Sequence, residues 1–553
     1  MIHPDNNKMI FRIFLATLLI LAVFSVFIYG ASYNHPGYDY YFHLKRFEAL
    51  ISALQDGRFP IYADYTASLG YGYIHRFFYS DIILIPFGLI GIFIGAQPAY
   101  EVMLFVMTIL CGLFMYKAVN IIYRNSYTAF IASILYTFSV YRLIDIYPRG
   151  ALGEVFAFTF LPIVFWGLYH IIKGNYHKWY VIAIGFSLLI FSHIISTVLA
   201  FITVVIVLII YYKPLIKEPK RILYLMLAGV TAVAITSSYI FPLFEQLSSN
   251  TFLYENNDWS LPSRTKLPLL HLLWALFCGF VFPKDIMVTG IGILLTLSIF
   301  IRFFIKGKPE GIKSVDIGVF IGLFYILASS SLFPWGRFPF SLLSFIQYPT
   351  RFYLFVTCFF AVAAAFYLSA VFVKSRQRQV IALVIVVCTI FTMYMHSENY
   401  KYMHRTYINQ TNEKPVPGNF FYLNGGEYVP ARVRSANYVQ ARGDSVISKF
   451  GNLSIDKFER EKGIINLSII TQTADSLELP LFYYKGYTAE LNGEKQPVSQ
   501  STHGLVQIPA DGSGNMKVYY AGTPVQRISW YVSIISILVI CIYIFKRKRK
   551  NHI

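Results

Sequence analysis

Charged side chains are scarce in this sequence. Only 14% of its 553 residues are Asp, Glu, Lys or Arg, whereas 56% are hydrophobic. A soluble globular protein carries roughly 25% charged residues. The composition therefore excludes a water-soluble globular protein and indicates a polytopic membrane protein.

Acidic residues are the scarcer of the two charge signs. The chain has 28 Asp and Glu against 47 Lys and Arg, which leaves a net charge of +19. The excess does not indicate nucleic-acid binding, because the basic residues lie mostly in short loops between apolar runs, where they set the orientation of membrane spans. We expect the bilayer as a partner and no nucleic acid.

Cysteine is absent from the long polar segment near the C-terminus, residues 397–527. The five cysteines all lie in apolar stretches, at Cys111, Cys278, Cys358, Cys388 and Cys541. This absence argues against a disulfide-stapled eukaryotic ectodomain and fits a bacterial outer surface without a disulfide framework. We expect the protein in the bacterial cytoplasmic membrane.

Long hydrophobic runs dominate the remainder. Twelve are long enough to cross the hydrocarbon core of a bilayer: Met9–Gly30, Glu101–Ile121, Ser126–Tyr141, Glu154–Ile172, Trp179–Ile195, Ser196–Tyr212, Ile222–Pro242, Ile286–Ile305, Val315–Phe333, Phe352–Val373, Val380–His396 and Ile528–Phe545. The first is longer than the apolar part of a signal peptide and has no small-x-small cleavage site, so we expect an uncleaved span.

Two further apolar segments, Asp81–Gln97 and Leu267–Phe282, are ambiguous. If neither crosses the membrane, the basic loops and the Lys- and Arg-rich C-terminal tail all lie on one side. The positive-inside rule then predicts twelve spans with both termini cytoplasmic. The two ambiguous segments become re-entrant or interfacial helices on the outer face, a placement tolerated where they line a cavity.

The polar segment reads as a different kind of structure. Phe450–Gly522 alternates polar and apolar residues and carries hairpin signals at Asn492-Gly493 and Asp511-Gly512, so we predict a small β-sandwich. It follows a Pro-, Gly- and Tyr-rich connector around Pro415–Gly426.

The predicted fold is mainly α, with about twelve transmembrane helices. Residues 1–396 form the membrane module, including an outer loop at 31–100 with juxtamembrane helices. Residues 397–527 form an extracytoplasmic β-rich domain, and residues 528–553 form the last span and a basic cytoplasmic tail.

The first outer loop, Tyr33–Ser80, holds the most informative polar residues. Asp39, His43 and Arg46 are spaced so that they share one face of a helix. A carboxylate, an imidazole and a guanidinium at a membrane face suggest acid–base chemistry on a lipid-borne substrate. The aromatic surroundings of Asp39 would raise its pKa and suit a general base. The alternative is a solvated loop acid or a helix N-cap.

His43 and Arg46 have two interpretations. They orient the acid or bind a phosphate, or they form surface ion pairs, His43 with Asp39 and Arg46 with Glu48. Neither interpretation is preferred on the sequence.

The second outer loop, Arg142–Glu154, also has two interpretations. Asp145 and Arg149 form a structural ion pair and Glu154 complements the dipole of the helix it begins. Alternatively, the two arginines of this loop bind a phosphate, because a guanidinium fork matches phosphate oxygens.

Two further candidates are His193 and Arg351. His193 sits between Ser and Thr neighbours where the chain reverses, so it is a turn residue or a minor part of the site. Arg351 opens a span at the outer face, either as a snorkelling anchor or as a ligand for a lipid phosphate. No residues at metal-ligand spacing surround His193, so we expect no cofactor, although a divalent metal is possible.

These motifs resemble the bacterial YfhO-like membrane proteins and the 6-pyruvoyl-tetrahydropterin synthase-related membrane proteins of the GT-C glycosyltransferase superfamily. The resemblance rests on Asp39-x-x-x-His43-x-x-Arg46, Asp56-Gly57-Arg58-Phe59-Pro60, Gly70-Tyr71-Gly72-Tyr73, Arg149-Gly150-x-x-x-Glu154, Ser192-His193, Gln347-Tyr348-Pro349-Thr350-Arg351-Phe352, and the stretches Leu479–Tyr487 and Val518–Gly522.

The resemblance implies an enzyme that moves a sugar, with inversion, from a polyprenyl-phosphate donor to an envelope glycopolymer or glycolipid on the outer face. Asp39 matches the acid that deprotonates the acceptor hydroxyl, and Arg149 and Arg351 would hold the lipid phosphate. The chain lacks the tight Asp-x-Asp or Asp-Glu pair of some relatives. Two alternatives are a transporter or flippase of a lipid-linked glycan and a non-catalytic scaffold with a binding β-domain.

Overall fold

The structure is a computed structural model that describes residues 4–29, 39–58, 61–256, 261–281, 288–410, 426–471 and 473–550. It is mainly helical, at 66%, as expected from the apolar runs. The start of the first outer loop, Tyr33–Tyr38, and Phe59-Pro60 of the Asp56–Pro60 motif lie outside the described residues, as does nearly all of the connector Pro415–Gly426. The chain divides into two compact units, which are described separately.

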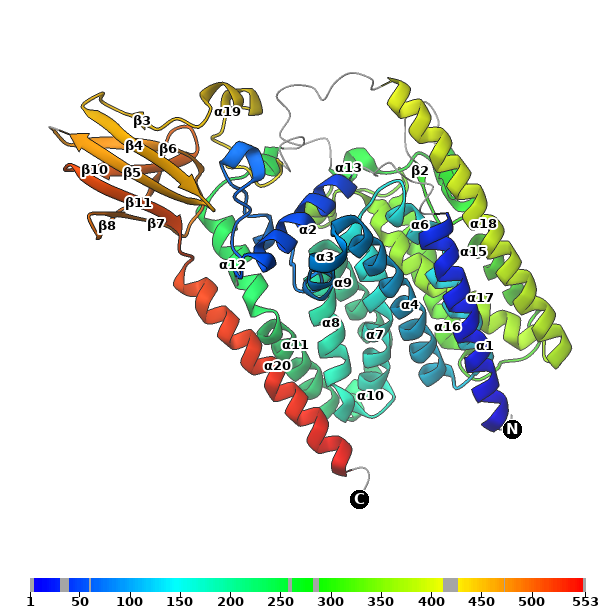
Figure 1. The fold of residues 1–553 in the computed structure, drawn as a ribbon. Helices are drawn as coiled ribbons and strands as arrows, with labels where there is room; N and C mark the ends of the chain where they lie inside the picture. The colour runs from blue at the N-terminus through cyan, green and yellow to red at the C-terminus, as the bar shows by residue number, and fades with distance from the viewer. Residues whose placement is uncertain are drawn as a thin grey trace. The chain divides into compact units, whose positions relative to one another are not determined.

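The first unit comprises residues 1–40, 98–232 and 258–410 and is built of helices. Its principal elements are α1 (Pro4–Val23), α4 (Ala96–Tyr123), α5 (Ser126–Thr137), α6 (Val140–Ile146), α7 (Leu152–Ile172), α8 (Tyr180–Ser192), α9 (Ile194–Ile210), α11 (Lys220–Ile235), α14 (Leu269–Phe277), α15 (Ile293–Ser298), α16 (Ile312–Ser329), α17 (Tyr353–Val371) and α18 (Ser375–Gln410) (Figure 1).

Within the described residues, seven helices are long and apolar enough to cross a membrane, or up to nine if each of two bent pairs is one span. The seven are Asn7–Ile28, Ala96–Tyr123, Leu152–Ile172, Ile312–Ser329, Pro349–Val371, Ser375–Glu398 and Pro524–Arg547. They coincide with predicted spans and support a membrane protein; the total of twelve stays a prediction.

The two ambiguous segments contain only short helices. α3 (Ile85–Ile94) has 10 residues and α14 has 9. At 1.5 Å per residue each is roughly 15 Å long, about half the ~30 Å hydrocarbon core. Helices of this length cannot cross alone, which agrees with the prediction that these segments do not span.

Two segments predicted as spans contain shorter helices than expected. In Ile286–Ile305 the chain forms β2 (Val288–Thr289) before the helical stretch Ile293–Phe304 begins. In Trp179–Ile195 the helix α8 has 13 residues and ends before His193, whose backbone is extended. Hydropathy does not register a break of this kind because the residues on both sides are equally apolar.

Helices α7 and α8 pack closely because glycines lie at their contact (Figure 1). A Cβ on Gly167 would collide with the backbone of Ile182, and one on Gly185 would lie 2.9 Å from the backbone nitrogen of Val164. Small residues let membrane helices approach to backbone contact. This packing joins the C-terminal half of α7 to α8.

The second unit comprises residues 41–97, 233–257 and 411–553. Its helices include α2 (Tyr40–Gln55), α3, α12 (Ser237–Ser249), α19 (Ala436–Arg442) and α20 (Pro524–Lys550), the red helix of Figure 1. The strands are β3 (Ile447–Ser448), β4 (Leu453–Glu461), β5 (Ile464–Thr471), β6 (Asp475–Phe482), β7 (Tyr487–Leu491), β8 (Glu494–Gln496), β9 (Ser499–Gln500), β10 (Leu505–Ala510) and β11 (Gly514–Tyr520).

These strands form two antiparallel sheets, of order β3-β6-β10-β9 and β4-β5-β11-β7-β8 (Figure 1). The predicted β-rich region at Phe450–Gly522 is thereby confirmed. Asn492-Gly493 makes the β7–β8 hairpin, as predicted. The prediction of a hairpin at Asp511-Gly512 is wrong. The turn connects β10 to β11, and these two strands lie in different sheets. The same turn chemistry serves both connections, so the sequence does not distinguish them.

The first outer loop is part of the same core as the sheets. Tyr71 and Tyr73 are buried in one hydrophobic cluster with strand residues such as Leu479 and Val518. The Tyr71 carbonyl accepts a hydrogen bond from the Phe482 backbone at 2.9 Å. The units therefore do not follow the predicted linear division at residues 396 and 527, since residues 41–97 group with the β-rich segment.

Two hairpin turns in this unit allow a matched test of that core. Gly463 and Gly493 each follow a positive-φ residue at the second position of a two-residue turn, with φ of 79° and 88°. A Cβ on Gly463 would collide with the Tyr65 ring, whereas one on Gly493 meets no atom within 4 Å. Both Gly→Ala changes incur a left-handed backbone penalty of about 1–2 kcal/mol, and Gly463→Ala adds about 1–3 kcal/mol of overpacking.

We therefore expect Gly463→Ala to lower the thermal midpoint of the purified full-length protein more than Gly493→Ala does. Equal shifts for the two variants would contradict the packing of Tyr65 against the β4–β5 turn.

Candidate functional site

The centre of the candidate site is an ion-pair network at the start of α7. Arg149 Nη2 lies 2.7 Å from Glu154 Oε1, and its Nη1 lies 2.5 Å from Asp145 Oδ1. Arg351 joins from the start of the α17 region, with Nε 3.3 Å from the same Glu154 oxygen. Tyr141 donates a hydrogen bond of 3.0 Å to the other oxygen, Oε2. Glu154 thus connects three partners.

The network is buried. Asp145 is 0% exposed and Glu154 is 2% exposed. Asp145 Oδ2 accepts no hydrogen bond from any part of the chain that the structure describes. Ionisable groups buried in a membrane protein are expensive to retain and mark functional sites by default. The interior of this unit therefore carries a polar centre rather than a uniformly apolar core.

The turn between α6 and α7 sets the geometry. The Arg149 backbone N–H donates to Ile144 O, and the Ala151 N–H donates to Asp145 O at 2.8 Å. Gly150 between them has φ of 65°, a conformation that favours glycine. A Cβ at Gly150 would lie 2.7 Å from the Cβ of Tyr40, so the glycine also admits the chain that follows Asp39.

Asp39 lies beside this network. Its backbone N–H donates to the Arg149 carbonyl at 2.8 Å. Residue 39 as a whole is exposed, but the protein packed around its carboxyl desolvates the charged form and raises its pKa. Arg149 and Arg351 act in the opposite direction, and Glu154 adds to the increase.

His193 lies beside the start of α7. A Cβ on Gly153 would be 3.2 Å from His193 Cδ2. Its Nδ1 lies 2.8 Å from the Ser196 hydroxyl and accepts from the Ser196 N–H, so the imidazole caps the N-terminus of α9. The prediction of a turn residue is thereby confirmed in its local geometry, and the ring is also next to the network.

The two arginines predicted in the second outer loop have separate roles. Arg142 is fully buried and donates to the Thr137 carbonyl at 2.9 Å and to the Thr108 hydroxyl at 3.0 Å. It satisfies the end of α5 where the helix pair α5–α6 bends by 42°. A phosphate site formed by Arg142 and Arg149 together is therefore wrong, because Arg142 is committed to the helix break. The ion-pair interpretation of Asp145 with Arg149 is confirmed.

His43 and Arg46 do not share a helix face with Asp39. The helix α2 begins at Tyr40, so Asp39 precedes it, and the two residues belong to the second unit. The ion-pair alternative proposed for Arg46 is also wrong in its partner, because Glu48 pairs with Lys45 at 2.8 Å and Arg46 pairs with Asp81 at 3.2 Å. The Arg46 side chain is buried, and a buried charge needs a buried partner of opposite sign, which Asp81 provides.

Three residues of these clusters are not indicated by any sequence motif: Tyr141, Arg76 and Asp81. In the sequence, Asp81 is only the first residue of an apolar segment. Among the described residues, no group of three or more His, Cys, Asp or Glu could hold a metal ion; the expectation that no cofactor is needed stays a prediction.

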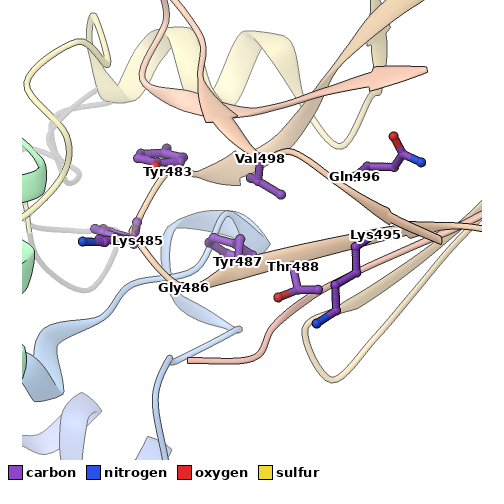
Figure 2. A pocket seen from close by; sticks show the side chains of 9 residues that line it. Tyr483, Lys485, Gly486, Tyr487, Thr488, Lys495, Gln496 and Val498 are labelled. Carbon is purple, nitrogen blue, oxygen red and sulfur yellow. The ribbon is translucent and has the colours of Figure 1, made fainter. Parts of the chain in front are cut away.

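A separate pocket of about 230 Å³ lies in the second unit, against the sandwich. Figure 2 shows Lys495 and Gln496 at one end of the pocket and Tyr483 and Lys485 at the other. Lys485 lies 3.5 Å from Glu245. Aromatic rings beside a few amine, amide and hydroxyl groups are typical of sites that bind polar organic ligands.

Comparison with known proteins gives one distant similarity to report. An "Uncharacterized protein" of Lactococcus lactis subsp. cremoris (strain MG1363) is 23% identical over 596 aligned residues, covering 97% of this chain and 96% of that protein. No family model matches the chain. No solved structure matches it. The alignment therefore extends through both the helical and the β-rich regions without assigning a family.

Proposed function

We propose that this protein is a membrane glycosyltransferase of the GT-C type, which moves a sugar from a polyprenyl-phosphate donor to an envelope glycopolymer or glycolipid. The observation that carries the proposal is the meeting of Asp39 with Arg149, Glu154 and Arg351. These residues come from three distant parts of the sequence and combine an accessible acid of raised pKa with two guanidinium groups.

In the proposed reaction, the Asp39 carboxylate takes the proton of the acceptor hydroxyl. The acceptor oxygen forms a bond to the anomeric carbon as the bond from that carbon to the phosphate oxygen breaks, which inverts the configuration. The phosphate leaves with the bonding electron pair. Arg149 and Arg351 stabilise its charge, at the expense of part of their pairing with Glu154.

The proposed location is the bacterial cytoplasmic membrane, with twelve spans, both termini cytoplasmic and the β-rich domain outside. The positive-inside distribution supports this orientation. The short helices α3 and α14 support it as well, because they add no crossing.

The pocket beside Tyr483 and Lys495 is the proposed contact for the acceptor. If it holds acceptor glycan, Tyr483→Ala should raise the KM for acceptor several-fold and leave kcat unchanged, because the lost contact is made equally in the ground and transition states. Val525→Ala, an exposed position on α20, is the control. An unchanged KM in Tyr483→Ala would exclude this pocket.

A non-catalytic scaffold is the second candidate, and one observation favours it. Both Nη atoms of Arg149 are already occupied by carboxylates, as in an ion-pair network that only holds helices together.

Sealed vesicles of known orientation distinguish the candidates. They are loaded with radiolabelled polyprenyl-phosphate sugar on one face and assayed for label in polymer and for label crossing the bilayer. Transfer supports the enzyme. Label that crosses without transfer indicates a flippase, and neither outcome indicates the scaffold.

A further inference from the structure

Asp81 in the second unit is held between two buried arginines. Its Oδ1 lies 3.2 Å from Arg46 Nε and its Oδ2 lies 3.0 Å from Arg76 Nε. The exposed fractions of the arginine side chains are 5% each, and that of Asp81 is 10%. Each of these ion pairs is made through the Nε atom of the arginine.

The two Nη groups of Arg76 have no hydrogen-bond acceptor among the described residues. Over the same ranges, the buried Ser238 hydroxyl has no partner either. An unsatisfied buried donor costs roughly 1–3 kcal/mol, and more when the group is charged. A guanidinium nine-tenths buried with both Nη groups unused is therefore a position built to meet an acceptor.

Arg76 and Ser238 line one cavity of about 60 Å³, together with Asp81 and Tyr239. A cavity needs roughly 10–15 Å³ to hold one water, so this space accepts a group larger than a single water. The Tyr239 hydroxyl, which also lines the cavity, donates to the Phe78 carbonyl at 2.6 Å. The two unsatisfied donors, Arg76 and Ser238, come from two separate segments of the chain.

The local charge favours an anion. Arg46 and Arg76 carry two positive charges against the single charge of Asp81. His75 stays neutral at pH 7, because burial lowers its pKa well below the usual range. Asp64 adds a second negative charge near Arg76, and Arg58 adds a third positive charge. The Asp64 Oδ1 accepts from the Thr66 N–H at 3.0 Å and the Thr66 hydroxyl at 2.7 Å.

We propose that the cavity between Arg76 and Ser238 binds a phosphate group, with the Arg76 fork and the Ser238 hydroxyl as donors. The geometry suits phosphate because a guanidinium fork makes two parallel hydrogen bonds to its oxygens. The site uses no residue of the Asp39 network and does not depend on the proposed glycosyltransferase function.

The other residues that line the cavity are mostly apolar, as in a site that binds lipid. Leu50, Ile82 and Ile85 are apolar, and Trp530 comes from α20, a candidate membrane span. Tryptophan at a span end is typical of the headgroup level of a bilayer. A phospholipid headgroup and a free phosphate ion share the same recognition chemistry here, and the experiment distinguishes them.

The test measures equilibrium binding to the detergent-purified full chain. The probes are ³²P-labelled inorganic phosphate, ³²P-labelled dioleoyl phosphatidic acid in micelles of a neutral detergent, and dioleoylglycerol, which lacks the phosphate. Arg76→Gln should weaken binding of a phosphate-bearing probe about tenfold or more, because it removes the charged fork. Arg58→Gln is the matched control, since Arg58 is a partly exposed arginine of the same region whose Nη2 pairs with Asp56 at 2.7 Å.

Selective loss of phosphatidic acid binding in Arg76→Gln supports a phospholipid site, and the same loss with inorganic phosphate supports a free-phosphate site. Equal binding of phosphatidic acid and dioleoylglycerol, no binding of either phosphate probe, or unchanged binding in Arg76→Gln overturns the proposal. If Arg76→Gln does not fold, Ser238→Ala decides: binding weakened threefold or more supports the site, and unchanged binding overturns it.

Discussion

Sugar transfer by the Asp39→Asn protein is expected to fall about 10²–10⁴-fold, the usual contribution of a general base. Asparagine keeps the size of the side chain but cannot accept a proton. The backbone hydrogen bond from residue 39 to Arg149 O is unaffected by the change, so the fold should survive. The measurement is the initial rate in the oriented vesicles described above.

The control for this prediction is Asp56→Asn. Asp56 is also an acid of the first outer loop, but it is paired with Arg58 and Lys462 in the second unit. The Asp56→Asn protein should transfer sugar at a rate within about twofold of the parent's, because a surface ion pair contributes little. A folded Asp39→Asn protein that transfers sugar at the parental rate would remove Asp39 from the mechanism.

The pH profile gives an independent check on the same residue. Burial raises the pKa of Asp39 above its ordinary value of 3.8. A base must be deprotonated to act, so activity should rise with pH through a midpoint higher than 3.8. The effect on stability has the opposite sign: the folded state holds the proton more tightly, and stability falls as pH rises through the same window.

The free energy of unfolding of the Glu154→Ala protein is expected to be about 3–5 kcal/mol lower than that of the parent. The change leaves Arg149 and Arg351 with buried charge that has lost a partner, and it also removes the acceptor of the Tyr141 hydroxyl. The measurement is reversible denaturation in mixed detergent micelles. The free energy of unfolding of the Glu154→Gln protein, which keeps an acceptor oxygen, should lie between those of the parent and the Glu154→Ala protein.

Glu48→Ala is the matched control for that loss. It breaks the Lys45–Glu48 pair, which has the same chemistry at 2.8 Å but is 47% and 40% exposed. Exposed pairs contribute about 0–1 kcal/mol, so its effect should be small. If the two alanine variants destabilised the protein equally, Glu154 would not be the buried junction of the network.

Elements whose signal is local in the sequence are predicted correctly, and elements that depend on tertiary contacts are not. Phe450–Gly522 was predicted as a sandwich because strands alternate polar and apolar residues over a few positions, a local signal that burial on one face enforces. The Asn492-Gly493 turn was equally local. The sequence indicates a chain reversal at His193 but not its capping of α9, since a cap depends on which nearby group bonds the backbone.

The sequence by itself determined the membrane character, the β-rich C-terminal region and the candidates Asp39, Asp145, Arg149, Glu154, His193 and Arg351. These follow from composition, periodicity and the rarity of charge in apolar chains. Only the tertiary structure decided which charges pair. It brought Asp39 and Arg351 to the Arg149–Glu154 pair and sent Arg46 to Asp81, beside Arg76. A buried charge takes the partner that packing brings within about 4 Å, and no spacing along the chain records that distance.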